Sequence, residues 1–370
     1  FAFDLSGNVT TGGGDILIWT GRGVDGDATR NGIGIKNNPH LNAGSGNVSL
    51  IAARLQNWDT ANSTLQVSST GTFTLASDEG APWASPFTWS TTTSGSNVTT
   101  SVLGQPLQIN NIASLSGFQL GSYQGMGSSF TYSNQANFTL SSALSIDGRI
   151  DIRGGVVTID ANLTSSANGD IFIKGIGNSN PCISVNSGRT INKSAGTGTL
   201  TLQGHSRVTN SGTISATGTG LLNVVMWSDF DNSNNDGGVS QFGTISTNGG
   251  HAWLGGSNSN GGSYTWNGLT VGDGPSIGSS GYNGNALDLY GSITTSNGHL
   301  FAWAGNGPGT NGIATNNTGT INAGTGNITL MANFTAGTFP LTTTGIISLV
   351  PNGGSYASAL TLGGSLSSGN

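Results

Sequence analysis

The sequence predicts an all-β protein, a parallel β-helix (β-solenoid) with loop insertions, and three observations support this fold class. Strand-like phrases recur, they alternate apolar and polar residues without a helical 3.6-residue period, and glycine or asparagine separates them. A short unit of this kind can bury its apolar face only by stacking on its neighbours, as the coils of a β-solenoid do. Glycine and asparagine suit the turns because they accept positive φ.

Two phrases define the repeat. The first combines a small residue, a β-branched pair, a glycine-containing turn and an alternating strand, and it occurs as GNVTTGGGDILIWTG (7–21), LTSSANGDIFIKG (163–175), GTISTNGGHAWLGG (243–256) and GSITTSNGHLFAWAG (291–305). The second phrase reads LNAGSGNVSLIAA (41–53) and returns as INAGTGNITLMA (321–332). We expect the aliphatic residues and Phe to point inward, and Thr and Ser to point outward.

The spacing of the phrases predicts coils of about two dozen residues. Leu163 and Ser187 begin successive phrases and lie 24 residues apart. Gly243 and Gly291 lie 48 residues apart, which predicts two coils between them. The polar stretch SDFDNSNNDGG (228–238) lengthens one coil, because repeat proteins absorb insertions in loops.

No change in composition divides the chain, so residues 1–370 are expected to form a single elongated β-solenoid. Residues 78–108 depart from the rhythm, since prolines and tryptophans crowd together in DEGAPWASPFTW. We predict that this segment is a lateral loop or irregular excursion on the same solenoid.

Trp19 and Trp303 end matching strands, in DILIWTG and HLFAWAG, and are expected to occupy the same site in two coils. Repeated aromatic residues either pack against neighbouring coils or serve as a platform for sugar rings. Packing is the expected role. His251 and His299 follow glycine at matching positions, which predicts stacked surface residues rather than metal ligands.

The composition excludes several classes of protein. Charged residues make up 7% of the chain, and ten Lys plus Arg offer no basic patch, so no nucleic-acid partner is expected. The apolar runs are short, so no membrane insertion is expected. Cys182, the single cysteine, cannot form an internal disulfide and is expected to be a buried thiol. Abundant Gly, Ser, Thr and Asn suit an extracellular or cell-surface protein.

The sixteen acidic residues offer few sites for chemistry. Asp and Arg alternate along IDGRIDIRGG (146–155), which predicts a solvated row of charges on one strand face. In SDFDNSNNDGG, Asp229, Asp231 and Asp236 resemble a calcium loop, but the later Glu of an EF-hand is missing. A solvated polar loop is therefore expected, with these three residues as the best calcium candidates. The sequence predicts no catalytic group, no metal and no cofactor.

Asn-x-Ser/Thr sequons mark candidate glycosylation sites. They occur at Asn8, Asn47, Asn62, Asn97, Asn137, Asn162, Asn192, Asn316, Asn327 and Asn333.

The phrases GSITTSNGHLFAWAGN, TGTINAGTGNITLMA and FTLSSALSIDGRIDIRGGVVTIDANLTSSANGDIFIKG resemble the β-strand repeats of filamentous-haemagglutinin-like proteins, the two-partner-secretion adhesins. The resemblance covers most of the chain apart from residues 78–108. It implies a right-handed parallel β-helix, secreted by Gram-negative bacteria, that acts as the stalk of an adhesin or as surface matrix.

We therefore expect a non-enzymatic structural or adhesive β-solenoid of a large secreted bacterial surface protein. The terminal coils are expected to be covered by further repeats of the same chain or by another copy, because a solenoid normally protects its end coils. Such copies would assemble end to end into an extracellular filament or sheath. A host or matrix glycan or protein is a further expected partner. The alternative is a carbohydrate-active parallel β-helix, a polysaccharide lyase or hydrolase, with Asp229, Asp231 and Asp236 as its acids.

Overall fold

The computed structural model describes most of the 370 residues of the chain. The described residues are 2–20, 32–52, 55–57, 64–69, 72–77, 87–91, 97–102, 105–110, 117–122, 137–140, 143–146, 149–233, 237–278, 285–305, 311–315, 319–332 and 340–352.

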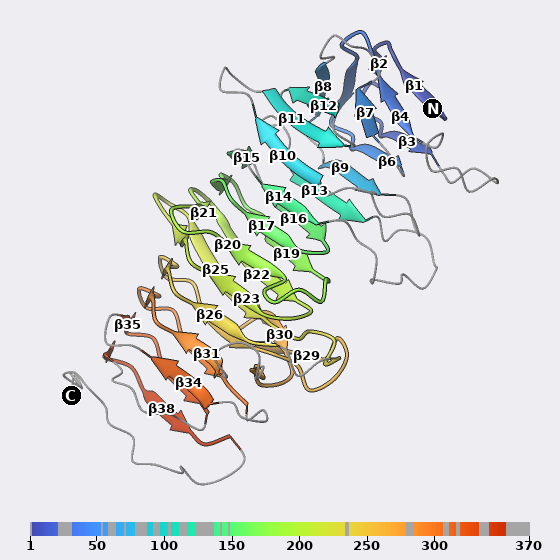
Figure 1. The fold of residues 1–370 in the computed structure, drawn as a ribbon. Coiled ribbons are helices and arrows are strands. Elements are labelled where there is room, and N and C mark those ends of the chain that lie inside the picture. The colour runs from blue at the N-terminus through green and yellow to red at the C-terminus, as the bar shows by residue number, and fades with distance from the viewer. Residues whose placement is uncertain are drawn as a thin grey trace. The chain divides into compact units, whose positions relative to one another are not determined.

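The chain divides into two compact units, Phe1–Asp170 and Ile171–Asn370, which we call the N-terminal and the C-terminal unit. The elements of the described residues are β-strands throughout, most of them in parallel ladders (Figure 1). The predicted fold class is confirmed, since the protein is an all-β parallel β-helix. In the part of the chain that the structure describes, no helix has the length and apolar character needed to cross a membrane.

In the C-terminal unit, successive strands go in turn to three parallel sheets, and one hairpin lies outside them. Sheet 1 contains β20 (Ile183–Val185), β23 (Val208–Asn210), β26 (Val239–Gln241), β31 (Asn285–Leu289) and β34 (Asn311–Thr315). Sheet 2 contains β21 (Thr190–Lys193), β24 (Thr213–Ala216), β27 (Thr244–Ser246), β32 (Ser292–Thr294), β35 (Ile321–Gly324) and β37 (Leu341–Thr343). Sheet 3 contains β19 (Ile171–Gly175), β22 (Thr197–Gly204), β25 (Leu221–Trp227), β28 (Ala252–Gly255), β33 (Leu300–Trp303), β36 (Ile328–Met331) and β38 (Ile347–Val350). The hairpin consists of β29 (Ser263–Trp266) and β30 (Leu269–Gly272).

The core of this unit is built from rows of inward side chains that stack from coil to coil. Leu202, Met226, Leu254, Ala302 and Leu330 hold the same position in successive strands of sheet 3, and each is 0% exposed. Full burial of a Leu or Met side chain stabilises the fold by about 1.5–3 kcal/mol. The predicted inward aliphatic stripe is confirmed in these strands.

The turn between sheet 2 and sheet 3 contains glycines for two physical reasons. Gly249 and Gly324 have φ of +99° and +58°, the left-handed conformation that the sequence predicts. Gly250, Gly298 and Gly326 have no positive φ, but a Cβ on each would strike the backbone carbonyl of the coil stacked before it. At these positions glycine is required because the stacked coils lie too close for a side chain.

The predicted pair of coils between Gly243 and Gly291 is wrong. Thr244 of β27 pairs directly with Ser292 of β32, so this interval forms one coil. The extra residues leave the coil after β28 and form the antiparallel hairpin β29–β30 before returning to β31. The spacing misleads because the insertion is about as long as an ordinary coil.

The hairpin β29–β30 covers the outer face of sheet 3. Trp253 of β28 points outward by strand alternation, yet it is 0% exposed. The Trp227 indole Nε1 donates a hydrogen bond to Ser257 Oγ at 2.7 Å, at the start of the insertion. The ring of Trp266 packs on Phe301, with ring centroids 5.9 Å apart. The insertion therefore adds a second apolar layer outside the coil.

The N-terminal unit stacks strands in the same way. One sheet contains β3 (Ile16–Thr20), β6 (Val48–Ala52), β9 (Thr72–Ser77), β13 (Gly117–Ser122) and β16 (Arg149–Gly154). A second contains β2 (Val9–Thr10), β5 (His40–Gly44), β8 (Thr64–Ser69), β12 (Gln105–Asn110), β11 (Asn97–Val102), β10 (Phe87–Thr91), β14 (Phe138–Leu140) and β17 (Val157–Ile159). Smaller ladders contain β1 (Phe3–Leu5), β4 (Ile33–Ile35) and β7 (Leu55–Asn57), and β15 (Leu144–Ile146) with β18 (Leu163–Ser165).

The segment predicted as an excursion, residues 78–108, contains β10, β11 and most of β12. These strands pair with one another antiparallel, whereas β12 pairs parallel with β8 and β10 pairs parallel with β14. The segment thus interrupts a parallel ladder with an antiparallel meander. The rest of 78–108 lies outside the described residues, and the single solenoid over residues 1–370 stays a prediction.

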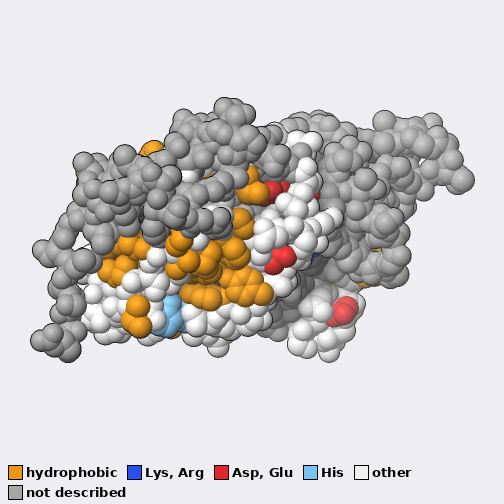
Figure 2. Space-filling model, turned by 90° about the horizontal axis from the view of Figure 1, so that it is seen from below, with side chains coloured by type: hydrophobic (Ala, Val, Ile, Leu, Met, Phe, Trp, Pro, Cys, Tyr) orange, Lys and Arg blue, Asp and Glu red, His pale blue; other side chains and the backbone are white. Residues whose placement is uncertain are grey.

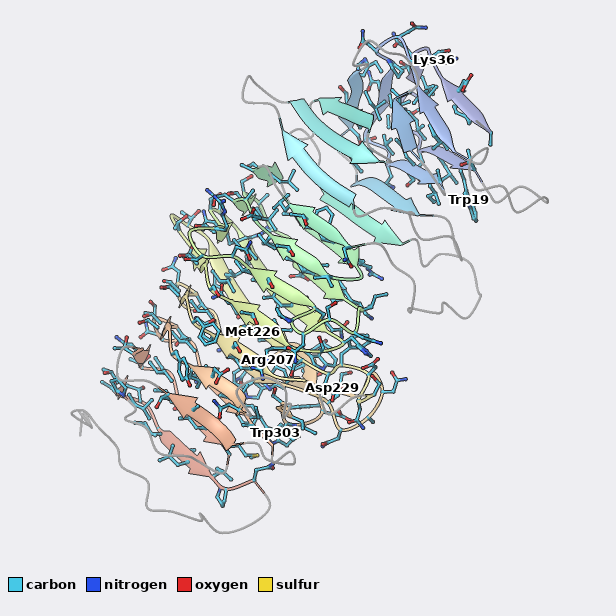
Figure 3. The ribbon with its side chains drawn as sticks, viewed as in Figure 1. Trp19, Lys36, Arg207, Met226, Asp229 and Trp303 are labelled. Carbon is cyan, nitrogen blue, oxygen red and sulfur yellow. The ribbon has the colours of Figure 1, made fainter. Side chains whose placement is uncertain are left out.

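Trp19 and Trp303 both hold the fourth position of their strands, β3 and β33, as the sequence predicts (Figure 3). Their surroundings differ. Trp303 is partly buried and stacks on Phe301, with ring centroids 6.0 Å apart. Trp19 is 39% exposed, so the expectation that both rings are well packed is wrong for Trp19.

Candidate functional site

The acidic loop SDFDNSNNDGG, which the sequence predicts to be a solvated polar loop with three calcium candidates, lies between β25 and β26 of the C-terminal unit. Asp229 has a left-handed φ of 48° and is 2% exposed, so the expectation of a solvated loop is not met at this residue (Figure 3). Asp231 reaches the turn that follows β22. Asp236 lies outside the described residues.

His205 and Asp231 form a hydrogen-bonded pair in this loop. His205 Nδ1 lies 2.6 Å from Asp231 Oδ2, and Ser233 Oγ donates to Asp231 Oδ1 at 3.0 Å. The backbone brings the two segments together, because the Phe230 N–H donates to the carbonyl of Gly204 at 3.1 Å. The loop is therefore tied to the preceding coil by both backbone and side-chain bonds.

The electrostatics of this pair favour its charged form. The hydrogen bond to Asp231 raises the pKa of His205 above its ordinary value, against the opposing effect of burial, and the charge of Asp229 adds to the rise. Burial acts to raise the pKa of Asp231, but the hydrogen bond from His205 and its positive charge outweigh it and lower that pKa. The two shifts agree in direction, so both favour the imidazolium–carboxylate form of the pair.

Lys174 of β19 adds a second positive charge beside the loop. Its Nζ lies 4.0 Å from the ring centroid of Phe230, and the residue is 9% exposed. A desolvated cation over an aromatic face is an attractive contact. We call Lys174, His205, Asp229, Phe230 and Asp231 the loop cluster.

The loop cluster contains groups that can move a proton, because an imidazole oriented by a carboxylate is a common general base. Both oxygens of Asp231 already accept hydrogen bonds, from His205 and from Ser233, and an imidazolium beside them would repel a cation. Within the described ranges, no three His, Cys, Asp or Glu side chains gather into a group that could hold a metal ion. What the geometry supports directly is the anchoring of the loop to the coil.

Replacement of Asp231 by asparagine is expected to lower the pKa of His205 towards its ordinary value of 6.5, because the dominant hydrogen bond loses its charge. The pKa of His205 is higher in the folded than in the unfolded state. The contribution of protonated His205 to the stability of the fold is therefore complete below about pH 6.5, and it is lost as the pH rises through the folded-state pKa. The effect of Asp231 is present above its ordinary value of 3.8 and is lost on acidification through the lowered folded value. An NMR titration of His205 measures the change. Asp273→Asn is the control, and an equal shift in that variant would contradict the assignment.

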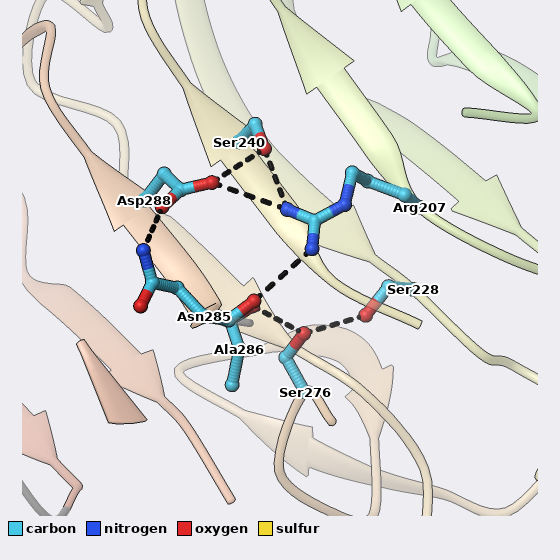
Figure 4. Close-up of polar contacts among 7 residues, drawn as sticks. All are labelled: Arg207, Ser228, Ser240, Ser276, Asn285, Ala286 and Asp288. Atoms are coloured by element: carbon cyan, nitrogen blue, oxygen red, sulfur yellow. Dashed lines mark hydrogen bonds and ion pairs between the residues drawn. The ribbon is translucent and has the colours of Figure 1, made fainter. Parts of the chain in front are cut away.

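A buried polar network joins three coils next to the loop cluster (Figure 4). Arg207 Nη1 donates to Ser240 Oγ at 2.7 Å and lies 3.2 Å from Asp288 Oδ2, and both charged side chains are 0% exposed. Arg207 Nη2 donates to the carbonyl of Asn285 at 3.1 Å, and Asn285 Nδ2 donates to Asp288 Oδ1 at 2.8 Å. The network fixes the end of the lateral insertion, where the chain re-enters the coil at β31.

Sequence reasoning missed this network. Arg207 and Asp288 lie 81 residues apart, and neither belongs to a motif. In the structure, Gly238 has φ of 152°, and a Cβ at this position would lie 2.7 Å from Arg207 Cζ. Glycine at this position leaves room for the guanidinium.

A polar ladder runs along one corner of the C-terminal unit, near the start of β25 and just before β28, β33, β36 and β38 of sheet 3. In this ladder each side chain accepts a hydrogen bond from the backbone N–H of the equivalent residue in the next coil. Asn223 Oδ1 accepts from His251, His251 Nδ1 from His299, His299 Nδ1 from Asn327, and Asn327 Oδ1 from Ile346, at 2.8 to 2.9 Å. The predicted stacking of His251 and His299 is confirmed, with ring centroids 5.0 Å apart and planes 6° apart.

The sequon asparagines differ in their surroundings. Asn8, Asn47, Asn137 and Asn162 are exposed, Asn192 and Asn327 are partly buried, Asn97 lies in β11, and Asn62, Asn316 and Asn333 lie outside the described residues. Some of these side chains link coils, since Asn8 Oδ1 accepts from the N–H of His40 and Asn137 Oδ1 from that of Val156. Glycosylation stays a prediction.

Two smaller expectations have clear outcomes. The charges of β16 are not all solvated, because Asp151 is 1% exposed and accepts two hydrogen bonds from Arg153, at 2.8 and 3.1 Å. Cys182 is a buried thiol as predicted, and burial raises its pKa. A buried, protonated thiol is a poor nucleophile.

A parallel β-solenoid with stacked glycines and hydrogen-bonded side-chain ladders is the class of protein that this fold and these sites define. Comparison with family models, with curated proteins and with solved structures found no match. The resemblance to filamentous-haemagglutinin-like repeats therefore stays a prediction.

Proposed function

We propose that the protein is a non-enzymatic structural or adhesive β-solenoid of a secreted bacterial surface protein, and that its coils continue end to end into a filament or sheath. The observation that carries this proposal is the use of the polar groups. The loop cluster, the Arg207 network and the polar ladder all join one coil to the next. These contacts hold neighbouring coils together, and the stability of a solenoid depends on such contacts between neighbours.

The described C-terminal coil supports end-to-end continuation. Ile328 and Leu330 of β36 are 0% exposed, whereas their partners Ile347 and Leu349 in β38 are partly exposed. Ile346, in the same coil, is 65% exposed. Figure 2 shows hydrophobic side chains gathered on the face seen from below. A further coil, from the same chain or from another copy, would bury the inward row of β38 and pair its backbone edge.

The proposed localisation is extracellular, and the proposed partners are further repeats or copies of the chain and a host or matrix glycan or protein. The support is the near absence of charge, since 7% of residues are charged, together with the turn-rich Gly, Ser, Thr and Asn composition.

Electron microscopy of the concentrated protein tests the assembly. We expect filaments whose repeat is a multiple of the inter-strand spacing of about 4.8 Å. Leu349→Glu places a charge in the inward row of β38 and is expected to abolish them. Val350→Glu, on the opposite face of the same strand, is the matched control and should leave them intact. Isolated monomers of the parent protein at high concentration would contradict the proposal.

The carbohydrate-active alternative is tested by polysaccharide turnover. Turnover that disappears when Asp229, Asp231 and Asp236 are replaced by alanine would overturn the non-enzymatic function.

A further inference from the structure

The polar ladder contains two rungs that differ chemically from the others. Asn223 and Asn327 accept through an amide oxygen, which stays an acceptor at every pH of interest. His251 and His299 accept through Nδ1, at 2.9 Å in both cases, and can do so only while Nδ1 carries no proton. Both rings must therefore be neutral, with the proton on Nε2.

Protonation of either ring turns an attraction into a repulsion. The imidazolium has two N–H donors, so Nδ1–H would face the backbone N–H of the next coil. The two rings also stack with centroids 5.0 Å apart, so two positive charges would oppose each other directly. The repulsion between Nδ1–H and the facing backbone N–H acts between β28 and β33 at His251, and between β33 and β36 at His299. The repulsion between the two charged rings acts between β28 and β33.

The hairpin is coupled to this stack. The ring of Trp266 meets His251 edge-on, with centroids 5.8 Å apart, and also packs on Phe301. Phe301 in turn stacks on Trp303. A change in the position of the His251 ring would therefore loosen the aromatic contacts that hold β29–β30 against sheet 3.

No opposite charge stabilises the protonated rings in the part of the chain that the structure describes. Neither ring forms an ion pair there, and the groups facing them are Asn223 from β25, Asn327 from β36 and the aromatic residues of β29 and β33. The titratable groups of the hairpin are engaged elsewhere, since Tyr264 packs towards Trp253 and Asp273 accepts from Asn258 and Ser259. Burial, and then the charge of His299, lower the pKa of His251 below its ordinary value.

We propose that the polar ladder is an acid-sensitive switch in which protonation of His251 opens the coil stack along this corner and releases the hairpin β29–β30. The direction of the pH dependence follows from the difference in the pKa of His251 between the folded and unfolded states. The pKa of His251 is lower in the folded than in the unfolded state, so the closed stack has its full stability above about pH 6.5 and loses stability as the pH falls below that value. The loop cluster has the opposite dependence, because the pKa of His205 is raised.

The test is hydrogen exchange of the full chain at pH 7 and pH 5, corrected for the intrinsic pH dependence of exchange. We expect the amide of His299 to lose protection at pH 5 relative to pH 7, because it donates to Nδ1 of His251 and loses that acceptor when the ring is protonated. The double variant His251→Asn, His299→Asn restores an acceptor of the kind that the ladder already uses at Asn223. It is expected to keep its protection at both pH values.

The control is His40→Asn, which removes a histidine in β5 of the N-terminal unit and should leave the acid-induced opening unchanged. Equal protection of the parent protein at pH 7 and pH 5, or equal opening of the double variant and the parent at pH 5, would overturn the switch. A second test needs only the parent protein and no variant. The imidazole nitrogens of His251 and His299 should show the Nε2–H tautomer by NMR at pH 7, and protonated Nδ1 atoms would refute the ladder.

Discussion

Replacement of Arg207 by methionine is expected to destabilise the coils around β26 and β31 by about 3 to 5 kcal/mol, because it leaves the carboxylate of Asp288 buried without its partner. Both side chains are 0% exposed, so water cannot take the place of the guanidinium. The variant also removes the hydrogen bonds to Ser240 and to the carbonyl of Asn285. Native-state hydrogen exchange measures the local free energy of opening in these strands, and the loss should fade in coils farther away.

An exposed ion pair of the same kind provides the control. Lys36 Nζ lies 3.1 Å from Asp4 Oδ2, but the side chains are 27% and 49% exposed. Lys36→Met is expected to cost no more than about 1 kcal/mol, because solvent screens such a pair. If Arg207→Met costs no more than Lys36→Met, the buried network does not hold the insertion in place.

Gly298→Ala is expected to destabilise the stack between β28, β33 and β36 by about 3 kcal/mol, near the upper end of typical overpacking costs. The new Cβ would strike the carbonyl of Gly250 in the preceding coil, and backbone atoms cannot rotate aside as a flexible side chain can. Hydrogen exchange of the β33 amides, measured at increasing denaturant concentrations, gives the loss in the free energy of opening.

Gly12→Ala is the matched control for this substitution. A Cβ at Gly12 would meet nothing within 4 Å, and Gly12 does not have a positive φ. The change should be neutral or stabilise the fold by up to about 1 kcal/mol, through the reduced freedom of the unfolded chain. A similar loss in both variants would show that glycine flexibility, rather than close stacking, matters at position 298.

The sequence predicts much of the architecture because each coil repeats the same local chemistry. Period-2 alternation predicts the inward aliphatic residues of ILIWT in β3, and matching positions predict the stack of His251 on His299. The expectation that Phe points inward is wrong for Phe301 of β33, which lies on the outer face with Trp253 because the hairpin covers that face. The sequence also identifies the turns, since glycine and asparagine mark them. It does not reveal why Gly250 and Gly298 must be glycine, because that reason lies in the distance to another coil.

The candidate sites were predicted less well than the strands. The acidic loop was expected to be solvated, yet Asp231 pairs with a histidine from the preceding coil, 26 residues earlier in the chain. The polar ladder could have been suspected because Asn223, His251, His299 and Asn327 hold equivalent positions in successive repeats. The direction of its hydrogen bonds follows only from the backbone positions.

The sequence by itself determined the all-β class, the inward rows and the places of the turns, because these depend on contacts within a strand or between repeated equivalents. The tertiary structure alone decided that the interval from Gly243 to Gly291 is one coil with a hairpin, and that Arg207 meets Asp288 inside it. The physical reason is the range of the interactions. Strand propensity and alternation act over a few residues, whereas the insertion and its buried ion pair are held by packing and hydrogen bonds between coils, and residue spacing carries no information about those partners.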